Sequence, residues 1–357
     1  MKYFTVGPSE LYPIVPSKIK SAVSQGILSM SHRAPIFDDL FESTVDNLRS
    51  LLAIPKKHSI FFLSSGTEGM ERIIQNMAMQ NTLHMVNGAF SEKFYQTALQ
   101  LKKKPIKNEV DLGKSFNWQE IYLPRDTELV CFTQNETSTG VALDLAEVYK
   151  LKKRFPKVLF ALDVVSSIPY VAIDYSKIDA VFFSVQKGFG LPAGLGVLIV
   201  SPAAISISLS LEKQNHSTGS YHSFSSLKTN ADKYETPETP NILGIYLLNE
   251  VVKDMLSKGI DLIRNETEEK AAYIETFVEK SRELSYLAKD SRIRSKTVHV
   301  LKVNSGAKIL MELLEKHGFM ISSGYGAMKN EYVRIANFPA HTAIDIKKIV
   351  RVLSSIE

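Results

Sequence analysis

Short hydrophobic runs of strand length recur along the chain, and segments with helical periodicity lie between them. The runs lie at residues 59–63, 83–86, 129–133, 158–163, 180–185 and 195–200. Their length and β-rich composition are typical of buried strands. Between the first two runs, four apolar residues share one helix face at the spacing i, i+3, i+4 and i+7. These are Met70, Ile73, Ile74 and Met77. The alternation predicts an α/β fold with a mostly parallel sheet and helices on both faces.

The pattern changes after about residue 245. We expect a long helical region over 260–287, then a strand at VHVLKV, a helix near Leu310 and a strand at VRIANF. This order is typical of a smaller α+β domain. We therefore predict a large domain of residues 16–245 and a small domain formed by residues 1–15 and 246–357.

The most hydrophobic stretch, LGVLIVSPAAISISLSL, starts at Leu195 and is interrupted by Pro202. After the proline, Ser206, Ser208 and Ser210 alternate with Ile and Leu. This alternation favours a strand over a membrane-spanning helix, so we predict no association with a membrane.

Composition narrows the possible classes of protein. The chain has 357 residues, of which 44% are hydrophobic, so it can bury a sizeable core. The net charge of +5 is too small to indicate a partner, and the basic clusters at 102–104 and 152–154 lack interleaved aromatic residues. We therefore predict no nucleic-acid partner. The N-terminus lacks the apolar segment of a secretory signal, and the single cysteine, Cys131, excludes an intrachain disulfide and a cysteine-rich metal site. A cytoplasmic protein without a bound metal fits these features.

Ligands of parallel sheets gather outside the carboxyl ends of the strands, and three predicted strands end in polar residues. The run at 59–63 leads into Ser-Ser-Gly-Thr and an amphipathic helix. The free N–H groups of such a helix start favour an anion such as phosphate, although an ordinary N-capped turn has the same sequence.

The other two strand ends carry charge. Asp163 ends an apolar strand, where a carboxylate is costly to bury without a cation, unless it only caps the next turn. Lys187 ends the run at 180–185 and precedes the glycine-rich GFGLPAG, although most such lysines are surface residues. One crossover and one strand separate Asp163 from Lys187, so both can face one pocket. A phosphate site, an amine and a carboxylate together suit pyridoxal 5′-phosphate (PLP).

Several motifs occur in an order that resembles a known family. They are FTVGPSELYP, SHRAPIF, SSGTEGM, VNGAFSEKF, QNETSTG, LDVVSS, SVQKGFG, ETPETPNILGIYLL and VRIANFPAHT. The chain is similar to the class V aminotransferases of the fold-type I PLP enzymes over nearly its whole length. Within that class it is most similar to the branch that acts on phosphoserine. The resemblance implies a PLP-dependent transaminase.

The resemblance also implies roles for matching residues. Lys187 would form the Schiff base with PLP and move the α-proton, and Asp163 would pair with the pyridinium nitrogen. Five further residues would hold the cofactor: Gly66, Thr67 and Gln186 at its phosphate, Phe90 on its ring and Thr137 on its hydroxyl side. Thr239 would reach the phosphate in a neighbouring subunit, which implies a homodimer with shared active sites.

The substrate is less clearly indicated. Arg334 would bind the α-carboxylate of the substrate, and His32 and Arg33 its distal anionic group, with phosphoserine and 2-oxoglutarate as the expected pair. The enzymes of that branch usually have a His-Arg pair before the carboxylate arginine. Residues 324–330 of this chain lack the pair, although Lys329 could replace part of its charge.

Three alternatives remain. The SSGTEG loop is closer to that of alanine or serine aminotransferases that use glyoxylate or pyruvate, which makes these the second choice. A cysteine desulfurase is disfavoured because Cys131 lies in an apolar strand. A non-catalytic interaction protein on the same fold is disfavoured because neither Lys187 nor Asp163 is needed for packing.

Overall fold

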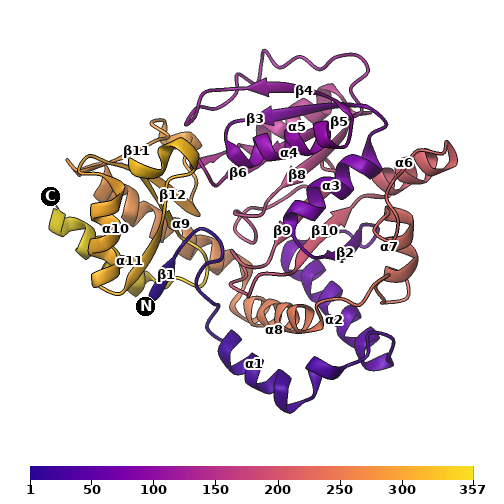
Figure 1. Cartoon of the computed structure of the whole chain (residues 1–357), viewed down its shortest axis with the longest axis horizontal. Coiled ribbons are helices and arrows are strands. Elements are labelled where there is room, and N and C mark those ends of the chain that lie inside the picture. The colour runs from indigo at the N-terminus through magenta and orange to yellow at the C-terminus, as the bar shows by residue number, and fades with distance from the viewer. Residues whose placement is uncertain (357) are drawn as a thin grey trace.

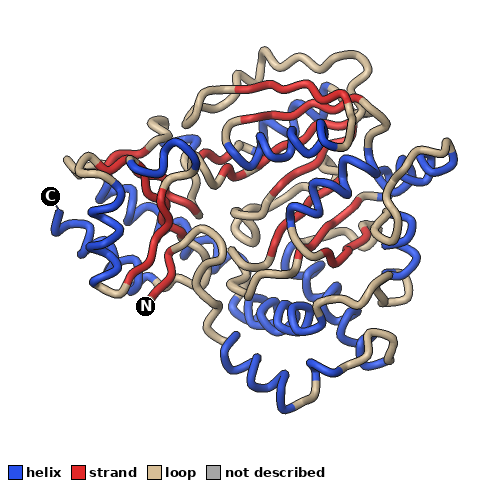
Figure 2. Tube along the Cα trace, viewed as in Figure 1, coloured by secondary structure: helices blue, strands red, loops and turns tan. Residues whose placement is uncertain are grey.

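The computed structural model describes residues 1–356. It contains two large sheets, each with its own helices (Figures 1 and 2), and a short two-stranded sheet that pairs β6 (Asn135–Glu136) with β7 (Val141–Ala142). The larger sheet has seven strands in the order β2, β10, β9, β8, β5, β3, β4. Their bounds are Ser59–Leu63, Gly196–Val200, Ala180–Ser184, Leu159–Asp163, Leu129–Thr133, Asn81–Val86 and Lys104–Glu109. Strand β10 runs in the direction opposite to the other six strands, which therefore all end at the same edge. The predicted mostly parallel α/β fold is confirmed.

Alternate residues of these strands enter two separate hydrophobic cores, as the two-residue period of a strand requires. In β9, Val181 and Phe183 face one core, whereas Ala180 and Phe182 face the other. The first face is covered by α1 (Val15–Ser24), α2 (Pro35–Leu52), α5 (Leu145–Arg154) and α8 (Ile242–Lys258). The second is covered by α3 (Gly66–Met77), α4 (Ala89–Gln100), α6 (Pro202–Lys213) and α7 (Phe224–Ala231). Buried runs thus form the central layer of a three-layer domain.

The strand predicted from the alternating serines is wrong, because Pro202–Lys213 forms the helix α6. Ser201 caps this helix by accepting a hydrogen bond from the amide of Ala204, and Pro202 occupies its first turn, where proline is tolerated. Ser208 lies on the buried face, and its hydroxyl donates to Asn76 Oδ1 at 2.7 Å. Ser208 therefore joins α6 to α3 by a hydrogen bond, and its position in the alternation does not indicate a strand. Within the described residues, no helix is long and apolar enough to cross a membrane.

The smaller sheet has five strands in the order β1, β13, β14, β12, β11. They span Lys2–Phe4, Phe319–Ser323, Tyr332–Ala336, Val298–Val303 and Leu284–Tyr286. Three helices, α9 (Ile260–Val278), α10 (Ala307–Lys316) and α11 (Ala343–Leu353), pack on this sheet. The helical region expected over 260–287 is therefore too long, because it ends at Val278 and β11 follows. Pairing of β1 with β13 joins the N-terminus to the C-terminal part of the chain (Figure 1). The exact domain boundaries stay a prediction.

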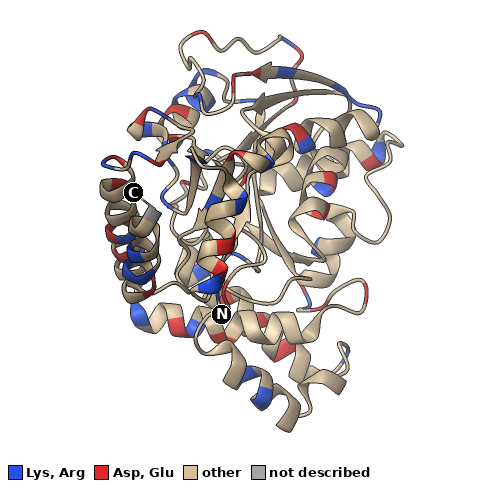
Figure 3. Cartoon of the chain, turned by 60° about the vertical axis from the view of Figure 1, so that its left-hand side comes forward, with Lys and Arg blue, Asp and Glu red and all other residues tan. Residues whose placement is uncertain are grey.

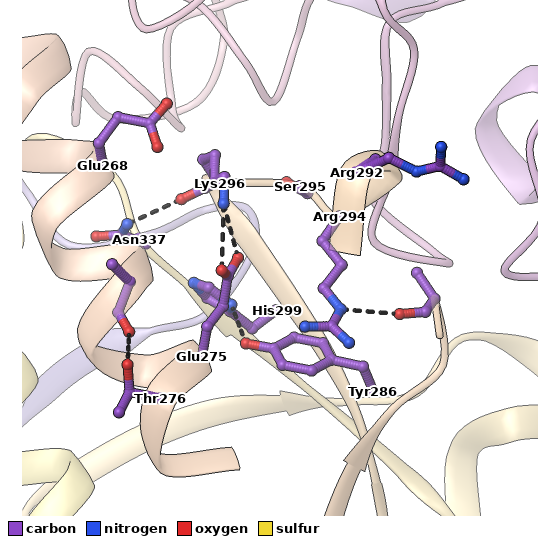
Figure 4. A network of polar contacts seen from close by, with 12 residues as sticks. Glu268, Glu275, Thr276, Tyr286, Arg292, Arg294, Ser295, Lys296, His299 and Asn337 are labelled. Carbon is purple, nitrogen blue, oxygen red and sulfur yellow. Dashed lines mark hydrogen bonds and ion pairs between the residues drawn. The ribbon is translucent and has the colours of Figure 1, made fainter. Parts of the chain in front are cut away.

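Polar contacts fix the segment before β12 to α9 and to the end of β14 (Figure 4). Lys296 Nζ donates to both carboxylate oxygens of Glu275 at 3.0 and 3.2 Å. Asn337 Nδ2 donates to the carbonyl oxygen of Lys296 at 2.8 Å. The segment is thereby held in a defined position beside the larger sheet. Elsewhere, basic and acidic residues are interspersed along the helices (Figure 3).

Candidate active site

A cavity of about 270 Å³ lies at the edge where the parallel strands end. Its walls come from the loops after β2, β3, β5, β8 and β9, from the N-terminal segment and from the smaller sheet. Eight of the residues predicted from sequence line it: Gly66, Thr67, Phe90, Thr137, Asp163, Gln186, Lys187 and Arg334. The topology therefore brings together the three strand ends on which the sequence interpretation depends.

Lys187 lies just after β9 and is only 6% exposed. Its Nζ donates to Thr137 Oγ1 at 3.3 Å and lies 5.2 Å from the centre of the Phe90 ring. Burial lowers the pKa of this amine to about 8, although Asp163 opposes the shift. Gly7 is also close, since a Cβ atom there would lie 2.7 Å from Lys187 Cε. A lowered pKa favours the neutral amine, which is the nucleophilic form.

Asp163 ends β8 and is 4% exposed. Burial raises the pKa of its carboxyl group to about 7, while the amide of Val165 and the charge of Lys187 act in the opposite direction. One carboxylate oxygen, Oδ1, accepts the Val165 amide at 2.8 Å. A buried carboxylate with so little solvation is stabilised by a cationic partner.

The loop after β2 forms the start of α3 as predicted. Ser65 caps the helix by accepting a hydrogen bond from the amide of Glu68 at 3.1 Å, and the amide of Gly66 donates to Ser184 Oγ at 2.7 Å. A Cβ atom at position 66 would lie 2.7 Å from that same oxygen, so only glycine allows the close approach. Lys93 Nζ, from α4, donates to Thr67 Oγ1 at 3.1 Å. Backbone amides, a hydroxyl and an amine therefore meet at one wall of the cavity.

The carboxylate of Glu136 organises the wall that carries Phe90. Glu136 is fully buried, and its oxygens accept the amides of Phe90, Ser91 and Ser138 at 3.1, 2.9 and 3.0 Å. Phe90 and Ser91 belong to the first turn of α4, where a negative charge is favoured by the helix dipole. The sequence interpretation missed Glu136, although it adjoins Thr137 in the QNETSTG motif.

A polar network continues from Lys187 towards the smaller sheet. The Thr137 hydroxyl donates to Ser166 Oγ at 2.9 Å, and Asn135 Nδ2 donates to Ser166 Oγ at 2.8 Å and to Thr297 Oγ1 at 3.1 Å. Thr297 adjoins Lys296, which α9 holds in place (Figure 4). The position of Thr137 beside the lysine therefore depends on contacts with the C-terminal part of the chain.

The wall that the smaller sheet contributes carries Arg334, in β14. Its Nε donates to the carbonyl oxygen of Ser323 at 2.8 Å, and its guanidinium carbon lies 5.6 Å from the centre of the Tyr325 ring. The Tyr325 and Phe90 rings are also 5.6 Å apart. Tyr325 lies in the segment that lacks the His-Arg pair, and the sequence interpretation did not single it out.

Several predicted residues lie elsewhere. His32, Arg33 and Thr239 do not line the cavity, and Arg33 is partly exposed and pairs with Glu235. Lys329, considered as a replacement for the missing pair, lines a separate depression beside α10. Cys131 is buried in β5, and burial raises the pKa of its thiol, which is unfavourable for a nucleophile.

Comparison with known proteins identifies the family. The model of the class-V aminotransferases matches residues 15–353. A phosphoserine aminotransferase from Cytophaga hutchinsonii is 42% identical, with a TM-score of 0.98 over 99% of this chain and 98% of that one. The phosphoserine aminotransferase of Rhodococcus opacus is 23% identical over 98% of this chain and 93% of its own length. An aspartate aminotransferase from Thermus thermophilus, 22% identical, shares the fold with a TM-score of 0.86 and complete coverage of both chains. The chain therefore belongs to the class-V aminotransferases and is an aminotransferase.

Proposed function

We propose that this aminotransferase uses PLP and transfers the amino group of phosphoserine to 2-oxoglutarate. The observation that carries the proposal is the convergence of Lys187, Asp163 and the α3 N-terminus on one cavity. These groups suit the aldehyde, the ring nitrogen and the phosphate of PLP, respectively. The 42% identical phosphoserine aminotransferase supports the choice of substrate.

The residues of the cavity fit PLP, which the family implies. Gln186 Oε1 and Thr133 Oγ1 are buried, line the cavity and have no hydrogen-bond partner among the described residues. Buried polar atoms of this kind need a partner, and a polar ligand supplies one. The amides of Gly66 and Glu68 are already bonded to Ser184 Oγ and Ser65 Oγ, so the amide of Thr67, between them, is the one that a phosphate would meet at the start of α3.

When bound, PLP supplies an aldehyde that condenses with amines and a protonated ring that withdraws electrons from the reacting carbon. Lys187 would hold that aldehyde through Nζ and would give up this place to the amine of the substrate. Its Nζ would then act as the base that takes the proton from the α-carbon of the substrate and as the acid that gives it back. Its lowered pKa, about 8, lets the same amine accept and release this proton near neutral pH.

The other residues of the cavity would orient the cofactor and the substrate and stabilise their charges. Asp163 would keep the ring nitrogen protonated, and the positive ring would in turn stabilise the buried carboxylate. Phe90 would cover one face of the ring, and Thr137, whose own hydroxyl donates to Ser166 Oγ, would contact its hydroxyl side. Arg334 binds the α-carboxylate of the substrate through its two remaining NH₂ groups, because its Nε is already bonded to Ser323.

We propose a homodimer in the cytoplasm as the active unit. His32, Arg33 and Thr239 lie outside the cavity of their own chain, so their proposed roles require the cavity of a second copy. Thr239 is exposed, as a residue that reaches a neighbouring subunit must be. His32 and Arg33 would then supply the charge for the phosphate of phosphoserine.

An aminotransferase that uses alanine or serine with glyoxylate or pyruvate is the second candidate. Tyr325 occupies the cavity wall where a basic pair would be expected, and Lys329 lies outside the cavity. A small uncharged substrate side chain would suit that aromatic wall better than a phosphate does.

The test is a set of half-reactions with purified, PLP-loaded enzyme. We expect phosphoserine and glutamate to discharge the visible absorbance of bound PLP faster than serine or alanine does. No response to phosphoserine, with a response to alanine or serine, would favour the second candidate. The variant Lys187→Ala should lose that absorbance and turnover, and an active yellow variant would refute the role of Lys187.

A further inference from the structure

We propose that Lys93 supplies the positive charge that binds the phosphate of the cofactor. The inference deepens the proposed function and rests on it. Lys93 lies in α4, three residues after Phe90, so both side chains project from the same side of the helix towards the cavity. One helix thus contacts both the ring and the phosphate of PLP.

The need for such a cation follows from the charges around the phosphate site. A phosphate monoester carries about −1.5 to −2 charges at neutral pH. The loop at 64–67 offers amides and hydroxyl groups but no cation, and the next residue, Glu68, is an acid. The carboxylate of Glu68 accepts the Ser64 amide at 2.8 Å and is hydrogen-bonded to His222, so its oxygens already have partners.

Three cationic side chains line the cavity, and two have other tasks. Lys187 would form the covalent link to PLP, and Arg334 comes from the smaller sheet, lies beside Tyr325 and is assigned to the carboxylate of the substrate. Lys93 remains. Its Nζ already donates to Thr67 Oγ1 at 3.1 Å, and Thr67 is one of the residues assigned to the phosphate.

Lys93 is also free to act. No carboxylate within residues 1–356 forms an ion pair with it, whereas the adjacent Glu92 pairs with Lys107 at 3.1 Å. An ammonium group has three donors, so two N–H bonds remain for phosphate oxygens after the bond to Thr67. Such charge-assisted hydrogen bonds are about twice as strong as neutral ones.

The experiment measures the equilibrium dissociation constants of PLP and of pyridoxal, which lacks the phosphate. Enzyme freed of PLP is titrated with each compound, and binding is followed by absorbance. In Lys93→Met the dissociation constant of PLP should rise about 10- to 100-fold, while that of pyridoxal stays within about twofold. Lys93→Arg should keep most of the affinity for PLP.

Lys153→Met is the matched control, because Lys153 is exposed at the end of α5 and lies outside the cavity. It should bind both compounds as the unmodified enzyme does. Equal PLP affinities of the Lys93→Met variant and the unmodified enzyme would overturn the inference, as would an equal loss for PLP and pyridoxal. Failure of the unmodified enzyme to bind PLP would instead overturn the proposed function.

Discussion

Replacing Glu136 by glutamine tests how the chain builds its cavity. The buried carboxylate accepts the amides of Phe90 and Ser91 through Oε2 and that of Ser138 through Oε1. Glutamine keeps the shape of the side chain, but it removes the charge and converts one acceptor oxygen into an NH₂ donor. If the remaining oxygen faces the two amides of α4, the NH₂ group faces the Ser138 amide, which then has no acceptor.

The expected cost has two sources. A buried amide that loses its acceptor costs about 1–3 kcal/mol. Removal of a negative charge from the N-terminus of α4 costs about 0.3–1 kcal/mol more. The free energy of unfolding should therefore fall by about 1.3–4 kcal/mol. Unfolding entropy is about 2.1 cal/mol/K per residue, so a chain of 357 residues should melt about 2–5 °C lower.

Differential scanning calorimetry of Glu136→Gln and Glu92→Gln would measure this difference. Glu92 undergoes the same chemical change and lies in the turn of α4 that Glu136 contacts, but its carboxylate is partly exposed and pairs with Lys107. Its loss should shift the melting temperature by about 1 °C or less. If Glu136→Gln melts no lower than Glu92→Gln, Glu136 does not anchor α4 as the hydrogen bonds indicate.

Two further predictions concern charge. Asp163→Asn should still bind PLP but slow single-turnover transamination by about 100-fold or more, because an amide does not stabilise a protonated ring nitrogen; a rate within threefold of the original would contradict this. Burial alone would lower the pKa of His222, but hydrogen bonds to Glu238 and Glu68 raise this pKa to about 9. The protonated imidazole therefore stabilises the fold fully below pH 6.5, and this stabilisation is lost as the pH rises through about 9. Melting temperatures of the unmodified enzyme and His222→Asn should therefore differ most below pH 6.5 and converge above pH 9, whereas the exposed His216→Asn should show no such trend; a difference independent of pH would refute the reasoning.

The parts of the fold that depend on short-range patterns could be predicted from the sequence. The apolar runs at 59–63 and 129–133 match β2 and β5 to the residue, because a strand buried on both faces has polar residues only at its ends. The alternating serines of α6 led to a wrong prediction because only their spacing was considered. A period of two residues indicates a strand only when no capping residue starts a helix, and Ser201 and Pro202 start one here.

The parts of the site that depend on contacts between distant loops could not be predicted from any single segment. In the sequence, Lys93 cannot be told from other surface lysines, and only the fold shows that its Nζ lies beside Thr67. Glu136 resembles a turn residue until the fold places α4 against it. Asp163 and Lys187 were predictable because each interrupts an apolar strand end, which is a signal within a single segment.

Glu136 joins the two kinds of interaction that this site requires. Its hydrogen bonds position the helix that carries Phe90 and Lys93, and its charge raises the pKa values of Lys187 and Asp163. Removing that charge should therefore lower the pKa of Lys187 below its present value of about 8 as well as loosen α4. The fold thus couples the position of the phosphate cation to the basicity of the reactive amine through one buried carboxylate, so the Glu136→Gln variant should alter PLP affinity and the pH dependence of transamination together.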